Sequence, residues 1–554
     1  MTQLKHDSLS RLLGPLTIRS WMLLLGTCLV LYGVNLGGAR VLTHHEIDVA
    51  GGARQMIAEG DWLIPKIGDH SWLEKPPLLH WLAGALIILF GEASEWVVRL
   101  PSVAAGVVLV FLLAMMVGRW LGEKAGLVAG LIQCTSWYMM TYARLAEADM
   151  LLACIVVAAI VLFIHLQGIG LPHPSNRPRL LALVFWVLIG LTNLCKGPLF
   201  GAAMVLTPCL AWLLWRRESR AWKQMWSPIG LSLGILIAVA WPALVLMKEP
   251  TALDLWLYHT VGRAKGATIY SRPWWYYLPM IPMQLLPWTP ITLIGTVPSL
   301  KRMWREGNSA DRFNWLWALV PILLLSLARG KSHHYLLSCL PGFTLVTTIA
   351  VLEIEQRIRE QNRYAVAVAR GAIFVLAPGA LLGGLVAGFK LTNFRADAWI
   401  LGVVVCLGLL LAGVFTLRRR PSRVFAVFLL TLVLSVVQVH VHLLPARDTR
   451  RPDRRFLTTL QEHLPPQPLI FATGGPEIVR HIFYVQVPLI GVWNPEDIGK
   501  HLGEQKVFFV VTRMNQLRLL ERFGTVSVVS QSEYTRNEES PQDRFTLFRV
   551  QRTT

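Results

Sequence analysis

The chain has 554 residues, of which 54% are hydrophobic and only 16% are charged, and its mean hydropathy is +0.48. The few charges fall between apolar runs long enough to cross a lipid bilayer, which excludes a cytosolic enzyme with a single membrane anchor. The net charge of +20 therefore indicates membrane topology and contact with anionic lipid, and we expect no nucleic-acid partner.

A basic N-terminal segment with Lys5, Arg11 and Arg19 precedes the first apolar run, and no small-residue cleavage site follows that run. This pattern predicts a first membrane span and not a signal peptide. Fourteen apolar runs lie near 21–42, 77–90, 96–118, 125–142, 150–167, 180–195, 198–215, 228–247, 276–298, 313–328, 335–352, 371–389, 398–417 and 424–444.

The second run, 77–90, has only about 14 residues before Gly91, whereas a spanning helix needs roughly 20. If this run does not cross, every loop rich in Lys and Arg falls on the same side as the basic N-terminus. The sequence therefore predicts a polytopic α-helical membrane protein with about thirteen transmembrane helices, in which 77–90 is interfacial or re-entrant. Its N-terminus would be inside and its C-terminus outside.

After Pro445 the composition becomes hydrophilic, which predicts a membrane domain over 1–445 and a soluble outer domain over 446–554. Short β-like runs are expected at 468–473, 488–493, 506–512, 525–531 and 544–550. Amphipathic helical stretches are expected between them at 476–484, 495–504 and 514–523. The alternation predicts a small α/β domain.

The predicted topology collects ionisable residues in the outer loops, of which the first is 43–95. This loop begins with His44-His45-Glu46-Ile47-Asp48, where an acid could act as general base or bind a metal, or could simply cap a solvated helix. It also contains Glu74-Lys75-Pro76-Pro77. A lysine at headgroup depth suits a lipid-borne phosphate, although a helix-end lysine that snorkels is the simple alternative.

Two further outer positions place charges between apolar runs. Arg144, Glu147 and Asp149 separate two spans, so they need partners or water, and Asp149 could be a helix N-cap. Lys196 lies in an apolar stretch with no acid near it in sequence, which favours a functional lysine over a snorkelling one.

The later outer loops add cations and histidines. Loop 248–275 contains His259, Arg263 and Arg272, which could contact lipid phosphate or only the headgroup layer. The segment from Lys331 to Tyr335 includes adjacent histidines, which alone are a weak signal for a metal.

These motifs, in this order, resemble those of ArnT-like GT-C glycosyltransferases, which are related to protein O-mannosyltransferases. The residues concerned are Glu74-Lys75-Pro76-Pro77-Leu78, Arg99-Leu100-Pro101-Ser102, Ala143-Arg144 with Asp149, Lys196-Gly197-Pro198, and Lys331 with Tyr335. The resemblance covers nearly the whole chain and implies the GT-C fold. It further implies an undecaprenyl-phosphate-linked sugar donor, such as 4-amino-4-deoxy-L-arabinose, and lipid A or another periplasmic acceptor. We therefore expect a monomer in the bacterial inner membrane, with the active site and C-terminal domain facing the periplasm.

The resemblance also implies roles for individual residues. Lys75 and Glu74 match the pair beside the donor phosphate, Lys196 the core lysine, and Tyr335 the tyrosine that lines the donor cavity. Asp149 matches the aspartate of the second outer loop, while His259 and either Arg263 or Arg272 match a histidine and an arginine of the fourth. The resemblance also implies that a divalent metal could bind at Glu74 and His259. It implies no essential cofactor.

The first outer loop departs from the family pattern, which typically reads Asp-Glu-x-Arg-Tyr. This chain has His45-Glu46-Ile47-Asp48-Val49, so His45 replaces the aspartate expected to bind or activate the acceptor. In a helix that starts here, residues 45 and 48 share a face. Either His45 and Asp48 act together, or Glu46 acts alone from the loop with Asp149 nearby. We favour Glu46, because the family also holds an acid there.

The function expected from these features is an inverting glycosyl transfer from undecaprenyl phosphate, with cations on the leaving phosphate. The alternatives are a protein O-glycosyltransferase of the same superfamily, a transporter of lipid-linked sugars, and a non-catalytic scaffold. Charges at the outer ends of spans and the lack of an evident repeat favour an enzyme over a transporter.

Overall fold

The computed structural model describes residues 16–38, 42–171, 177–197, 199–262, 265, 271–305, 309–360, 363–390, 395–448, 456, 460–466, 469–474, 483, 489–503, 505–532 and 544–552. The chain divides into two compact units. The first comprises 1–36, 74–76 and 100–443, and the second comprises 37–73, 77–99 and 444–554.

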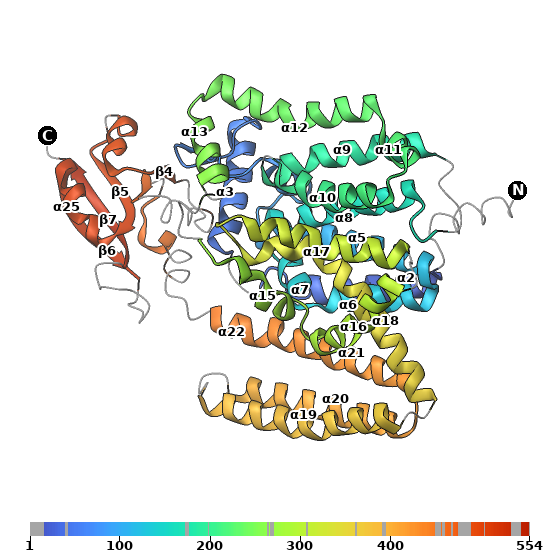
Figure 1. The fold of residues 1–554 in the computed structure, drawn as a ribbon. Helices are drawn as coiled ribbons and strands as arrows, with labels where there is room; N and C mark the ends of the chain where they lie inside the picture. The colour runs from blue at the N-terminus through green and yellow to red at the C-terminus, as the bar shows by residue number, and fades with distance from the viewer. Residues whose placement is uncertain are drawn as a thin grey trace, which may run out of the picture. The chain divides into compact units, whose positions relative to one another are not determined.

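The first unit is helical, and each apolar run predicted within it coincides with one helix or with two consecutive helices (Figure 1). In chain order these are α2 (Ile18–Cys28) with the π-helical turn η1 (Leu29–Gly33), α5 (Glu95–Leu121), α6 (Glu123–Thr135), α7 (Trp137–Ala143), α8 (Ala148–Gln167), α9 (Pro178–Lys196), α10 (Phe200–Arg216), α12 (Pro228–Lys248), α15 (Tyr277–Gln284), α16 (Thr289–Arg305), α17 (Ser309–Leu327), η4 (His333–Cys339) with α18 (Leu340–Arg359), α19 (Arg363–Lys390), α20 (Arg395–Leu417) and α21 (Pro421–Gln438) with η6 (Val439–Leu443). Between them lie the short helices α11 (Ser219–Met225), α13 (Ala252–Leu257), η2 (Tyr258–Gly262) and η3 (Trp274–Tyr276).

Eight helices in the described part of the chain are long and apolar enough to cross a membrane, and shorter apolar helices accompany them. The chain is therefore a multi-pass membrane protein. The count of thirteen spans stays a prediction, because two of the predicted runs are each divided into a pair of shorter helices, α6 with α7 and α15 with α16.

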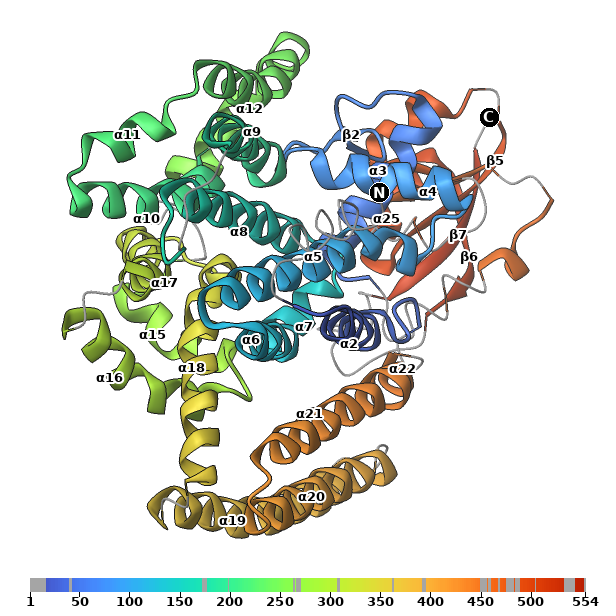
Figure 2. The same ribbon diagram turned by 90° about the vertical axis from the view of Figure 1, so that its right-hand side faces the viewer.

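Close helix packing in the first unit depends on small residues. Helix α9 lies against α8 and α12, and α19 lies along α20 (Figures 1 and 2). A Cβ atom on Gly190 of α9 would lie only 2.3 Å from the carbonyl oxygen of Gly234 in α12. The two backbones can meet at this point only because both positions are glycine.

The second unit begins with the juxtamembrane helix α3 (His44–Glu59), which starts with a capping box. The Thr43 side chain accepts from the Glu46 backbone N–H, and the Glu46 side chain accepts from the Thr43 backbone N–H. The predicted helix start near residue 45 is thus confirmed.

Helix α4 (Leu78–Phe90) spans only about 20 Å at about 1.5 Å per residue, against a hydrocarbon core of about 30 Å. Whether α4 crosses the membrane stays a prediction.

A small hairpin, β1 (Lys66–Ile67) and β2 (His70–Ser71), lies between these two helices. The Gln55 side chain of α3 bonds both backbone groups of Gly68 at the hairpin turn. The Trp493 indole N–H donates to the Ile67 carbonyl at 2.9 Å, and its ring lies 4.0 Å from the His70 ring. The hairpin is therefore fixed both to α3 and to the C-terminal part of the chain.

The C-terminal part forms a mixed five-stranded sheet in the order β4-β3-β5-β7-β6, preceded by α22 (Leu444–Asp448) and the short turn η7 (Leu460–His463). The strands are β3 (Ile470–Thr473), β4 (Ile490–Val492), β5 (Val507–Arg513), β6 (Gly524–Gln531) and β7 (Phe545–Arg552). Strand β3 is parallel to β4 and β5, whereas β7 is antiparallel to β5 and β6 (Figure 2). All five predicted β-like runs are confirmed as strands.

Hydrophobic side chains point alternately to the two faces along the strands, so a hydrophobic core forms on each face of the sheet. Phe508 and Val510 of β5 face one core, while Phe509 and Val511 face the other. Short helices cover the sheet between strands, namely η9 (Pro495–His501), η10 (Met514–Gln516), α25 (Leu517–Leu520) and η11 (Glu521–Phe523). These fit the predicted helical stretches 495–504 and 514–523, and the stretch 476–484 lies almost wholly outside the described residues.

Candidate active site

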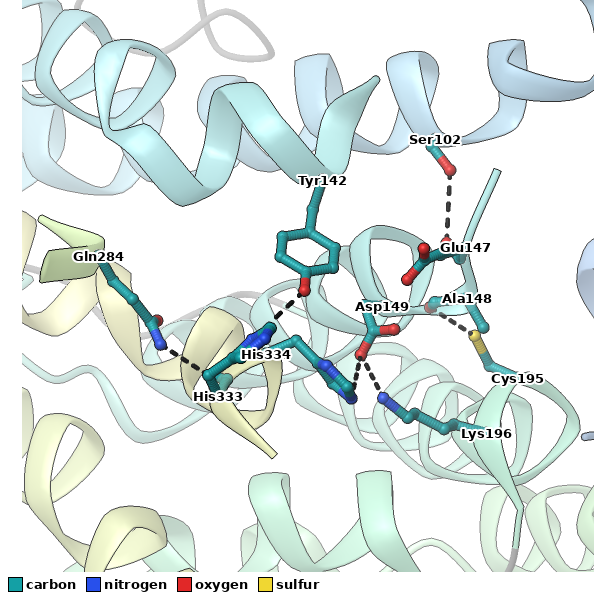
Figure 3. Close-up of polar contacts among 10 residues, drawn as sticks. All are labelled: Ser102, Tyr142, Glu147, Ala148, Asp149, Cys195, Lys196, Gln284, His333 and His334. Carbon is teal, nitrogen blue, oxygen red and sulfur yellow. Dashed lines mark hydrogen bonds and ion pairs between the residues drawn. The ribbon is translucent and has the colours of Figure 1, made fainter. Parts of the chain in front are cut away.

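The N-terminus of α8 and the C-terminus of α9 meet at a buried ion pair. Asp149 is the second residue of α8, and Lys196 is the last residue of α9. The Lys196 ammonium donates a hydrogen bond to Asp149 Oδ1, and the two side chains are 11% and 6% exposed (Figure 3). The helix dipoles favour an anion and a cation at these respective ends. The alternative prediction that Asp149 is an N-cap is wrong, because Glu147 occupies that position.

A tight turn after α9 sets the direction of Lys196. Gly197 has a φ of +93°, and Leu199 has a φ of +65°, which is rare for a residue with a side chain. The side-chain oxygen of Asn193 closes the turn by accepting from the Leu199 backbone N–H at 3.0 Å. The Lys196 ammonium also lies 4.9 Å from the centre of the Tyr335 ring, close enough for a cation–π contact.

A histidine approaches the same carboxylate from η4. His334 Nε2 lies 3.7 Å from Asp149 Oδ1, the oxygen that accepts from Lys196 (Figure 3). The imidazole and the ammonium therefore face one carboxylate oxygen from two different elements. The Cys195 thiol, one residue before the lysine, donates to the Ala148 carbonyl at 3.3 Å and ties the two helix ends together.

The backbone around His334 is held by its neighbour His333. The Tyr142 hydroxyl of α7 lies 3.5 Å from His333 Nδ1, and the Gln284 amide of α15 donates to the His333 carbonyl at 2.6 Å (Figure 3). These two contacts fix the position of the adjacent imidazole next to the ion pair. The sequence indicated these histidines only as a weak metal signal, whereas the structure places His334 against an acid.

Lys75 contributes to the charge environment of this group. Its half-buried side chain lies near enough to Asp149 and His334 to act on both electrostatically. Glu74, the residue before it, is exposed. The structure thus gathers Lys75, Lys196 and Tyr335 around Asp149, and their role toward a donor phosphate stays a prediction.

The remaining predicted donor-site residues are Arg272, His259 and Arg263. Arg272 is exposed, and its carbonyl accepts from the buried Lys331 ammonium at 3.3 Å. Its backbone N–H donates to the Arg329 carbonyl at 2.9 Å, so this segment runs beside the chain that leads into η4. His259 is half-buried in η2, and Arg263 lies outside the described residues.

The optional metal site at Glu74 and His259 is not confirmed. In the part of the chain that the structure describes, no group of three or more His, Cys, Asp or Glu side chains could hold a metal ion. Stable binding of a divalent cation by protein side chains commonly needs three or more ligands, and Glu74 and His259 would supply only two.

The second unit contains the residues of the first outer loop, and here Glu46 forms a buried ion pair. Glu46 and Arg99 are 0% and 1% exposed, and Arg99 Nε donates to Glu46 Oε1 at 2.8 Å. The other carboxylate oxygen accepts from Arg99 Nη2 at 3.3 Å and from the Thr43 backbone N–H at 2.8 Å. Glu46 therefore lies in α3 and not in a loop, and both its oxygens hold structural partners.

His45 and Asp48 are three residues apart in the first turns of α3, as the sequence predicted. His45 is half-buried, and its ring lies 4.0 Å from that of His44. Asp48 is 2% exposed. The helix therefore provides the shared face that a histidine base oriented by a carboxylate requires.

Arg99 and Arg144 belong to sequence segments that carry the family resemblance, but the partners of their side chains could not be predicted. Arg144 donates to the carbonyls of Leu31 and Val34 at 2.9 and 2.6 Å, where η1 ends. Both arginines are buried. Arg99 pairs with Glu46 of α3, and Arg144 caps the carbonyls at the end of η1. The sequence indicates both arginines through the family resemblance and through a charge next to an apolar run, and neither signal names a partner.

Comparison with known proteins finds a matching family model and similar curated proteins. A family model described as dolichyl-phosphate-mannose-protein mannosyltransferase matches residues 74–244. The undecaprenyl phosphate-alpha-4-amino-4-deoxy-L-arabinose arabinosyl transferase of Edwardsiella ictaluri is 29% identical over 381 residues, which cover 67% of this chain and 65% of that protein. The protein of the same name from Pseudomonas aeruginosa is 28% identical over 63% of this chain and 62% of its own length. The chain thus matches slightly less than two thirds of these relatives.

Solved structures extend the similarity to the whole fold. The crystal structure of ArnT from Cupriavidus metallidurans bound to undecaprenyl phosphate superposes with a TM-score of 0.77 at 19% identity, over 96% of this chain and 98% of that one. The archaeal oligosaccharyltransferase AglB from Archaeoglobus fulgidus gives a TM-score of 0.51 at 12% identity, over 96% and 75% of the two chains. These matches confirm the predicted GT-C fold and the resemblance to ArnT-like glycosyltransferases.

Proposed function

We propose that this chain is a glycosyltransferase of the bacterial inner membrane that takes a sugar from undecaprenyl phosphate and works at the periplasmic face. The sugar we propose is 4-amino-4-deoxy-L-arabinose, which the names of the curated relatives contain. The acceptor we propose is lipid A, and the five-stranded sheet would face the periplasm with the active site.

The observation that carries this proposal is the group of Lys75, Lys196 and Tyr335 around Asp149. It joins the ends of two apolar helices, and there we place the phosphate of the lipid donor. In the proposed reaction an acceptor oxygen attacks the anomeric carbon, and the bond from that carbon to the phosphate oxygen breaks with inversion. The leaving phosphate gains negative charge, which nearby ammonium groups stabilise in a site shielded from water.

The proton of the acceptor needs a base, and we assign this role to His45 with Asp48 one helical turn along α3. Glu46, the residue favoured from the sequence, has both oxygens engaged by Arg99 and by the helix cap. If Glu46 accepted a proton, the buried Arg99 would lose its counter-ion. The free-energy cost of that unpaired charge would exceed the gain from binding the proton. Proton uptake by the His45 imidazole leaves the ion pair of Glu46 and Arg99 intact.

A protein acceptor is the second candidate, because the family model that matches 74–244 is described as a protein mannosyltransferase. The donor chemistry would be the same, since both reactions release a polyprenyl phosphate. The two candidates differ only in which envelope molecule gains mass.

Mass spectrometry of lipid A, glycans and envelope proteins from cells with and without the gene tests the proposal. We expect lipid A to lose a mass increment of one aminopentose when the gene is deleted, and to regain it when the gene is restored. Loss of a glycan from a protein would support the second candidate. Unchanged spectra under conditions in which the protein is present in the membrane would contradict both.

A further inference from the structure

Asp149 Oδ1 is approached by two basic groups of different kinds. The Lys196 ammonium donates to it directly, whereas His334 Nε2 lies at 3.7 Å, just beyond hydrogen-bond distance (Figure 3). The sequence gives no reason for a second basic partner, because one ammonium is enough to neutralise one carboxylate.

The two partners differ in how firmly they are held. Lys196 stands at the end of α9, and its flexible stem brings the ammonium within 4.9 Å of the Tyr335 ring centre and 5.6 Å of the Phe200 ring centre. His334 has a short side chain on a backbone that Gln284 fixes through the His333 carbonyl. The lysine can therefore turn away from the carboxylate, while the imidazole cannot move far from it.

We propose that a lipid phosphate competes with Asp149 for Lys196, and that His334 takes over the carboxylate when the lysine turns to the phosphate. This inference rests on the proposed function, because it concerns the same phosphate. A carboxylate that is 5% exposed cannot lose its cation without a replacement. His334 supplies the replacement by binding a proton, since only the protonated imidazole carries a positive charge.

The consequence is that phosphate binding is coupled to proton uptake at one histidine. Charged and titratable groups face His334 from its own segment and from four others, namely Asp149 in α8, Lys196 in α9, Lys75 in segment 74–76, Tyr142 in α7, and His333 and Tyr335 in η4. Burial and a nearby ammonium both oppose a proton on the imidazole, whereas the Asp149 carboxylate favours it. Movement of Lys196 toward a phosphate therefore shifts the balance toward the protonated imidazole.

Calorimetric titration of the full-length protein with undecaprenyl phosphate in detergent micelles tests this coupling. Each titration is repeated at pH 7 in two buffers with different ionisation enthalpies, which gives the number of protons bound per phosphate. We expect His334→Gln to bind about one proton fewer than the unchanged protein, or the fraction of one proton set by the pH. His501→Gln is the control, because it removes an exposed imidazole of η9 that the proposed exchange does not use, and its proton count should equal that of the unchanged protein.

Asp149→Asn provides a second variant that does not depend on the histidine. A neutral amide needs no replacement cation, so its proton count should fall as it does in His334→Gln. Equal proton counts in the unchanged protein and in His334→Gln, with phosphate still bound, would overturn the exchange and leave the proposed function standing. Failure of the unchanged protein to bind undecaprenyl phosphate would instead contradict the proposed function itself.

Discussion

Individual buried charges divide into those that hold the fold and those available for chemistry. Both carboxylate oxygens of Glu46 are hydrogen-bonded to Arg99 or to the cap of α3, so this charge stabilises the fold. Asp149 is equally buried, but its partner Lys196 is a flexible side chain at a helix end. Glu46 and Asp149 are therefore distinguished by the rigidity of their partners and not by how exposed they are.

Glu46→Gln should destabilise the protein, because it leaves the Arg99 guanidinium buried without a counter-ion. Breaking a buried ion pair from one side costs about 3–5 kcal/mol, and glutamine retains the capping-box contact. We expect a clearly lower melting temperature in detergent. Glu59→Gln is the control, since that carboxylate is half-exposed at the other end of the same helix and pairs with the surface residue Lys66. Equal stability of the two variants would contradict the structural role of Glu46.

His45→Ala should reduce sugar transfer per folded molecule by about 10²–10⁴-fold, the usual contribution of a general base. Asp48→Asn should reduce transfer less, because it removes only the group that orients the imidazole. The neighbouring His44→Ala serves as control, as His44 is exposed on α3. Transfer that survives in His45→Ala but is lost in correctly folded Glu46→Gln would return the base role to Glu46.

At the scale of elements, hydropathy was enough to locate the helices and strands. The apolar runs and the five β-like runs could be predicted because burial imposes periods that are visible in the sequence. The breaks within 125–142 and 276–298 could not, since both halves of each run are apolar. The pairing of Asp149 with Lys196 was equally hidden, because 47 residues separate them and only the packing of α8 on α9 brings them together.

The hairpin of 66–71 shows an element whose role follows from its neighbours. Trp493 contacts it by ring stacking and by two hydrogen bonds, one to Ile67 and one to the Asp69 side chain. The hairpin leads within a few residues to Lys75. The C-terminal part of the chain therefore holds the hairpin that precedes Lys75 in sequence.

Trp493→Ala should raise the KM for the lipid-linked sugar more than it lowers kcat, because it frees the chain that leads to Lys75. Trp493→Phe retains a ring to stack on His70 and loses only the indole N–H, so its effect should be smaller. Hydrogen exchange over 66–73 should increase in the alanine variant. Unchanged exchange in this segment would show that the indole does not hold the hairpin.

At the scale of the whole molecule, the distribution of Lys and Arg predicts which loops face the periplasm. A reporter fused after Gly122 should behave as cytoplasmic, and one fused after Pro445 as periplasmic. Fusions after Gly91 and before Lys66 should report the same side, because we predict that α4 does not cross. A cytoplasmic signal after Pro445 would place the candidate site on the wrong face for a periplasmic acceptor.

The central claim is that Lys75 and its neighbours hold the phosphate of a lipid-linked sugar during its transfer. The most direct measurement is sugar transfer by the purified protein in liposomes that contain the undecaprenyl-phosphate-linked aminoarabinose and lipid A. Lys75→Ala should fold, insert and lose transfer by at least about 10²-fold, as expected when a cation on the leaving phosphate is removed. Lys506→Ala, which removes an exposed lysine of the C-terminal part of the chain, should retain transfer. Full transfer by Lys75→Ala would contradict the account.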